Sequence, residues 1–132
     1  MTRILLDTSG YSALLRGHEE VKAALQRAEL ICVNPAVLAE LRAGFLKGTR
    51  RGENERMLRS FLASPRVQVV DISEETAHRY AVIFDALLLA GSPIPTNDVW
   101  IAASAMEHGL RLVTTDTHYQ KVSQVLVSCF EA

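Results

Sequence analysis

Four acidic residues of this chain, Asp7, Glu40, Asp98 and Asp116, could together bind a divalent metal ion. Asp7 and Asp116 directly follow short apolar runs that are typical of buried strands. Ligands of open α/β sheets bind outside the carboxyl ends of the strands, so the two carboxylates could meet at that edge. Because like charges placed close together repel each other, a bound cation commonly stabilises such a cluster. The four acids therefore predict a metal site.

Each acid taken alone has a simpler structural explanation. Asp7 and Asp116 could form the turns that follow their strands, and Asp98 could favour a helix start by lying in its first turn. Glu40 lies in a helical pattern, where a glutamate is most often a solvated surface charge. However, the helix after Asp98 is apolar nearly all round, which draws its first turn inward, and a buried carboxylate needs a partner. Only the combination favours a metal.

Carboxylates in this arrangement suit Mg²⁺ and the hydrolysis of a phosphodiester. Mg²⁺ takes oxygen ligands in octahedral geometry and usually keeps several waters. Two ions about 3.5–4 Å apart can activate an attacking water and stabilise the leaving oxygen. Thr8 and Thr114 lie beside the strand-end acids, and their hydroxyls could position that water or hold the carboxylates. Whether the site binds one ion or two remains open.

The elements that must position these acids alternate between strands and helices. Strands are expected at residues 4–6, 30–33, 67–70, 112–115 and 125–130. Helices are expected at 19–28, 36–47, 53–63, 73–90 and 97–108, with shorter helical turns around 11–15 and 117–121. This alternation predicts an α/β fold with a mainly parallel central sheet of about five strands, flanked by helices. The length of 132 residues predicts a single domain over 1–132.

Composition and charge are those of a globular protein. Hydrophobic residues make up 48% of the chain and charged residues 22%. The apolar runs are too short for a signal peptide core or a membrane span. Cys32 and Cys129 lie in apolar strand-like runs and are expected to be buried, reduced thiols. A cytoplasmic location follows.

The net charge of −1 does not exclude a polyanionic substrate, since setting the four acids aside leaves 11 acidic against 14 basic residues.

Other chemistries fit the sequence less well. An aspartyl nucleophile of a phosphatase normally has a second Asp two residues later, where this chain has Ser9. The sequence contains neither a Gly-x-Gly-x-x-Gly motif nor a Walker phosphate loop, which argues against a nucleotide cofactor. The histidines lack metalloprotease spacing. Only His118 stands near a candidate acid, as an optional neighbour of Asp116.

Taken in order, the motifs of this chain resemble those of a PIN-domain nuclease. They are the Leu-Leu-Asp-Thr-Ser segment at 5–9, Glu40 in a mid-chain helix, Asp-Val-Trp-Ile-Ala-Ala at 98–103, and Leu-Val-Thr-Thr-Asp at 112–116. The resemblance spans essentially the whole chain and is closest to the VapC-type toxins of prokaryotic toxin–antitoxin pairs. Asp-x-x-Ile-Ala-Ala followed by Thr-x-Asp is its most specific part.

The resemblance implies an endoribonuclease that depends on Mg²⁺ or Mn²⁺. Asp7, Glu40, Asp98 and Asp116 would form its acidic cluster, with Thr114 as the supporting hydroxyl. It also implies a homodimer and a cognate antitoxin whose tail, often basic, enters the acidic cleft and blocks it. Where many relatives have Phe after the last motif, this chain has Tyr, and we expect the difference to affect only local packing.

A group of basic residues downstream of Glu40 is a candidate for phosphate contacts. Arg50 and Arg51, beside two glycines in an expected turn, are its best candidates for binding RNA. A solvated face, with Glu53 and Glu55 interleaved, is the alternative for this group. It is favoured for Arg56 and Arg59.

Two other functions remain open from the sequence. A catalytically silent PIN-like module would bind RNA or protein, with its carboxylates only capping helices and turns. A small-molecule phosphohydrolase would turn over simple phosphate esters.

Overall fold

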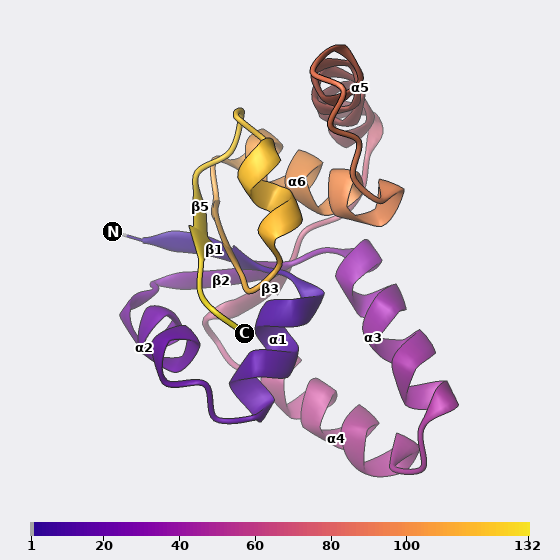
Figure 1. Cartoon of the computed structure of the whole chain (residues 1–132). Helices are drawn as coiled ribbons and strands as arrows, with labels where there is room; N and C mark the ends of the chain where they lie inside the picture. Colours follow the sequence, from indigo (N-terminus) through magenta and orange to yellow (C-terminus); the bar gives the residue numbers. More distant parts are fainter. Residues whose placement is uncertain (1) are drawn as a thin grey trace.

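The computed structural model describes residues 2–132 and contains a parallel sheet of five strands (Figure 1). The strands are β1 (Arg3–Leu6), β2 (Leu30–Val33), β3 (Val67–Val69), β4 (Arg111–Thr114) and β5 (Val127–Cys129). Their order across the sheet is β3-β2-β1-β4-β5, and every neighbouring pair is parallel. The predicted parallel α/β sheet is confirmed.

Six α-helices and one short 3-10 helix connect and cover the strands. They are α1 (Thr8–Leu15), α2 (Glu19–Arg27), α3 (Pro35–Lys47), α4 (Arg51–Leu62), α5 (Glu74–Leu89), α6 (Thr96–His108) and the 3-10 helix η1 (Thr117–Lys121). In Figure 1, α3 and α4 form a hairpin at one end of the molecule, while α5 lies against α6 at the other. None of the helices in the described part of the chain is long and apolar enough to cross a membrane.

The central strands are buried on both faces, which explains their continuous apolar sequences. Leu5 and Leu6 of β1 are fully buried, as is Leu112 of β4. Leu5 pairs with Leu112 and Leu6 with Val113, so β1 and β4 end side by side. The residues that follow the two strands are thereby placed next to each other at the same edge of the sheet.

Helix α1 lies unusually close to β4 through Gly10. A Cβ atom built on Gly10 would stand 2.7 Å from Leu6 Cδ1 and 2.8 Å from the carbonyl oxygen of Val113. Only a residue without a side chain permits this approach. The glycine therefore brings the first turn of α1, with its hydroxyl side chains, onto the end of β4.

The buried Asn34 links α3 to α6. It is fully buried, and its Oδ1 caps α3 by accepting from the backbone N–H of Val37 at 3.1 Å. Its Nδ2 donates to Ser104 Oγ at 2.9 Å and to the carbonyl oxygen of Trp100 at 3.2 Å. A single amide thus fixes the helix that carries Glu40 against the helix that carries Asp98.

Several sequence-based boundaries differ from the structure. Helix α4 begins at Arg51 rather than at residue 53, so Arg51 belongs to a helix and only residues 48–50 form the turn. Strand β4 ends at Thr114, because the N–H of Thr115 donates to the Ser9 hydroxyl instead of to a neighbouring strand. Of the two cysteines, Cys32 is buried and Cys129 is only partly so. Both are free thiols.

Candidate metal centre

Asp7 ends β1 and caps α1, and its carboxylate is held by several donors. The backbone N–H of Gly10 donates to Oδ1 at 2.7 Å, and the Thr114 hydroxyl donates to Oδ2 at 2.7 Å. The Ser9 hydroxyl lies 3.0 and 2.9 Å from the two oxygens. The side chain is only 3% exposed. Its orientation is therefore fixed before any ligand binds.

Burial raises the pKa of Asp7 from 3.8 to about 6. The hydrogen bonds from Thr114, Gly10 and Ser9 oppose this rise, whereas the nearby charge of Asp116 adds to it. The pKa of Asp98 is raised as well, mainly by burial. Keeping Asp7 and Asp98 ionised in the metal-free protein therefore lowers the free energy of unfolding.

This cost predicts that the metal-free protein loses stability as the pH rises. The folded protein binds the Asp7 proton more tightly than the unfolded chain does, because the pKa of Asp7 is higher in the folded state. The stability contributed by this proton is complete below the unfolded pKa and is lost as the pH rises through the folded pKa. The free energy of unfolding should fall by about 3 kcal/mol between about pH 4 and about pH 7. Denaturant melts in chelator across this range measure it. Asp7→Asn should remove most of this dependence of the free energy of unfolding on pH. An unchanged dependence in that variant would show that Asp7 is not its source.

Asp98, Asp116 and His118 form a group of possible metal ligands. His118 Nδ1 lies 3.1 Å from Asp98 Oδ2 and 3.3 Å from Asp116 Oδ1. One ligand atom from each of the three residues lies within 4.8 Å of the others. Asp116 caps η1 by accepting from the backbone N–H of His118 at 2.9 Å. The first turn of α6 and the start of η1 thus meet at one point.

The hydroxyl of Tyr119 belongs to the same site. It donates to Asp98 Oδ1 at 3.2 Å, and the ring is 1% exposed. Burial and the charges of Asp7, Asp98 and Glu40 raise the pKa of Tyr119, so it stays a protonated donor. The expectation that a tyrosine here changes only packing is therefore wrong. A phenylalanine could not make this hydrogen bond.

Glu40 reaches the site from α3 and is half-buried. Thr8 Oγ1 donates to Glu40 Oε1 at 2.6 Å, and Asn97 Nδ2 lies 3.4 Å from Oε2. These two donors are the direct neighbours of Asp7 and Asp98 in sequence. Thr8, proposed from the sequence to position water or a carboxylate, holds this carboxylate.

Thr114 connects the two strand-end acids. Its hydroxyl donates to Asp7 and accepts from the backbone N–H of Asp116 at 2.9 Å. The Ser9 hydroxyl lies 3.1 Å from Thr114 Oγ1 and accepts from Thr115 N–H at 3.0 Å. The sequence analysis used Ser9 only to argue against an aspartyl nucleophile and as part of the motif at 5–9, although its position two residues after Asp7 was a usable signal.

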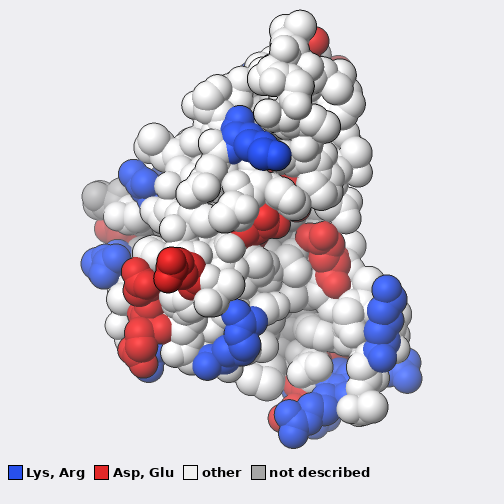
Figure 2. All heavy atoms as spheres, viewed as in Figure 1, with Lys and Arg blue, Asp and Glu red and all other residues white. Residues whose placement is uncertain are grey.

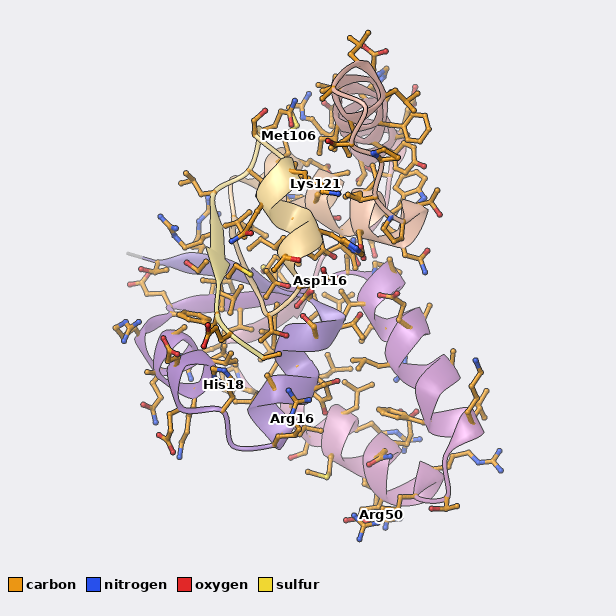
Figure 3. The ribbon with its side chains drawn as sticks, in the orientation of Figure 1. Arg16, His18, Arg50, Met106, Asp116 and Lys121 are labelled. Atoms are coloured by element: carbon orange, nitrogen blue, oxygen red, sulfur yellow. The ribbon has the colours of Figure 1, made fainter. Side chains whose placement is uncertain are left out.

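The two arginines proposed for RNA contacts lie away from the acids. Figure 3 shows Arg50 at the tip of the α3–α4 hairpin and Asp116 near the centre of the molecule. Arg50 is largely exposed and lies 3.7 Å from Glu53. Figure 2 shows acidic side chains near the middle of this face and basic ones along its lower right margin. An RNA contact by Arg50 or Arg51 would therefore lie outside the acidic cluster, and it stays a prediction.

The ligand set fits a divalent cation. Within residues 2–132, Asp7, Glu40, Asp98 and Asp116 form no ion pair with lysine or arginine, and His118 alone pairs with two of them. Buried carboxylates without a cationic partner are costly. Carboxylate oxygens with one imidazole nitrogen are ordinary ligands for divalent ions.

Carboxylates gathered at the carboxyl ends of the central strands of a parallel sheet are typical of an α/β protein. Such proteins bind their ligands in the crevice outside that edge of the sheet. The PIN domain matches residues 4–125, and the chain belongs to the PIN-domain family.

Known relatives agree with this assignment. The chain is 32% identical to "Ribonuclease VapC4" of Mycobacterium tuberculosis over 72% of its own length and 73% of the relative. It is 34% identical to "Toxin FitB" of Neisseria gonorrhoeae, covering 86% of this chain and 88% of that one. The crystal structure of VapBC2 from Rickettsia felis, bound to a DNA fragment from their promoter, superimposes with a TM-score of 0.84 at 23% identity and covers 96% and 98% of the two chains.

Proposed function

We infer that this protein is the toxin of a toxin–antitoxin pair and acts as an endoribonuclease that requires a divalent metal ion. The observation that carries the metal dependence is that Asp98, Asp116 and His118 meet beside the buried Asp7, with no lysine or arginine of residues 2–132 paired with them. Membership of the PIN-domain family and similarity to a named ribonuclease and a named toxin support RNA as the substrate.

In the proposed mechanism, Asp98 and Asp116 would hold the ion directly, and Asp7 and Glu40 would complete the acidic cluster. A bound Mg²⁺ or Mn²⁺ would lower the pKa of a water, so that the water loses a proton and becomes a nucleophile for phosphorus at neutral pH. Tyr119 and Thr114 orient Asp98 and Asp7 through their hydroxyls. Glu40 is half-buried and can accept the proton that the attacking water releases.

The proposed partners follow from the same features. An antitoxin segment with a basic residue would supply the lysine or arginine that the acidic cluster does not receive from the described part of this chain. A second copy of the chain is expected at α5, where Val82, Leu88 and Leu89 are 49%, 55% and 82% exposed. Sedimentation at the mass of one chain would contradict the dimer. The cytoplasm remains the proposed location.

Metal removal tests the proposal. Purified protein freed of its antitoxin should cleave structured RNA in Mg²⁺ or Mn²⁺ and lose cleavage in chelator, because the carboxylates then have no cation to place at the phosphate. Adding metal back should restore the activity. Cleavage that persists unchanged in chelator would overturn the metal mechanism. Turnover of simple phosphate esters without RNA cleavage would favour a phosphohydrolase. Metal binding without any cleavage would favour a silent binding module.

A further inference from the structure

We propose that His118 is a direct metal ligand and makes the site prefer a transition-metal dication such as Mn²⁺ over Mg²⁺. The inference rests on the metal-dependent function proposed above and deepens it. It concerns one nitrogen atom, His118 Nδ1, and the two carboxylate oxygens that face it.

The distances around Nδ1 fit a shared ion. Two adjacent ligands that each stand about 2.1 Å from one octahedral ion are about 3.0 Å apart. His118 Nδ1 lies 3.1 Å from Asp98 Oδ2 and 3.3 Å from Asp116 Oδ1. The separations of the nitrogen from the two carboxylate oxygens therefore match those of adjacent ligands on one ion.

The local backbone holds the imidazole in this position. The backbone N–H of His118 donates to Asp116 Oδ1, the same oxygen that lies 3.3 Å from its ring nitrogen. Asp98 Oδ1 is occupied by the Tyr119 hydroxyl, which leaves Oδ2 to face the ring. The His118 side chain is 44% exposed, so the ring stands at the open side of the cluster, where an ion can reach it.

A nitrogen ligand changes which ion the site favours. Mg²⁺ binds oxygen ligands and gains little from imidazole, whereas imidazole binds transition-metal ions well. Carboxylate ligands suit Mg²⁺ and Mn²⁺ alike. With His118 in the coordination sphere, the site prefers Mn²⁺ over Mg²⁺.

A purely structural role for His118 makes different predictions. The imidazole could donate a hydrogen bond to one carboxylate and balance its charge without touching the ion. In that case the bound ion would see only oxygen atoms. The magnetic coupling between Mn²⁺ and a ligating nitrogen separates the two roles, and it requires no enzymatic turnover.

Pulsed electron paramagnetic resonance of Mn²⁺ bound to the full-length, chelator-stripped protein provides this test. Wild-type protein should show coupling to a directly bound nitrogen, and isotopic labelling of histidine should change the coupling pattern without any mutation. His118→Asn, which offers an oxygen in place of the nitrogen, should bind Mn²⁺ without the coupling. His78→Asn is the matched control, because His78 is exposed on α5, and it should keep the coupling.

Competition between the two ions gives a second readout. The ratio of the Mg²⁺ and Mn²⁺ dissociation constants should fall by on the order of tenfold in His118→Asn and stay unchanged in His78→Asn. Mn²⁺ binding without nitrogen coupling in the wild type would overturn the role of His118 while the metal-dependent function stands. An absence of any Mn²⁺ or Mg²⁺ binding would overturn both.

Discussion

Replacement of Asp98 by asparagine is expected to lower the rate of RNA cleavage by at least about a hundredfold, because it removes a charged ligand from the centre of the site. The amide keeps the shape of the carboxylate and can still accept the Tyr119 hydroxyl. Asp98 is 8% exposed, and burial raises its pKa, so its charge does not stabilise the metal-free fold. The variant should therefore lose activity without losing stability.

The measurement is single-turnover cleavage of one RNA at saturating protein and metal, together with denaturant melts of the metal-free proteins. Asp71→Asn is the matched control, because Asp71 is exposed, precedes α5 and lies outside the acidic cluster. It should cleave at the wild-type rate. Wild-type cleavage by Asp98→Asn would remove Asp98 from the proposed mechanism. A large loss of stability would instead indicate that the carboxylate mainly supports the fold.

Replacement of Asn34 by alanine is expected to lower the free energy of unfolding by about 2–4 kcal/mol. The loss combines the cap of α3 with the hydrogen bonds to Ser104 and Trp100, whose polar groups are left without this donor in a buried position. Because Asn34 joins the helices of Glu40 and Asp98, cleavage should fall as well, even under conditions where the variant is folded.

Urea melts measure the stability change, and circular dichroism identifies the conditions in which the variant is folded. Asn54→Ala in α4 is the control, because its side chain is only partly buried and is not used to join helices. It should change the free energy of unfolding by less than about 1 kcal/mol. Equal effects of the two substitutions would show that the buried amide does not hold α3 to α6.

The sequence alone was sufficient to predict the fold and to predict that the two strand-end acids lie close together. Continuous apolar runs such as Leu5-Leu6 and Leu112-Val113 are diagnostic of strands buried on both faces, and an acid after such a run must lie near the carboxyl edge. Element ends were less predictable. The start of α4 at Arg51 depends on a turn at residues 48–50, which helix propensity alone does not locate.

The contacts inside the site could not be predicted, because they join residues that are far apart in sequence. The hydroxyl of Thr114 and the carboxylate of Asp7 are separated by 107 positions, and Asn97 and Glu40 by 57. From the sequence, His118 was predicted only as an optional neighbour of Asp116, and Tyr119 was expected to affect only local packing. Only the start of η1, folded against the first turn of α6, places both side chains on Asp98.

The pairing of β1 with β4 also determines when the acidic cluster can assemble as the chain is synthesised. Asp7 leaves the ribosome early, whereas Asp116 and its strand are synthesised near the end of the 132 residues. A growing chain that lacks β4 has only part of the acidic cluster, because Thr114 and Asp116 are not yet made. The order of the strands therefore delays assembly of the cluster until β4 can pair with β1.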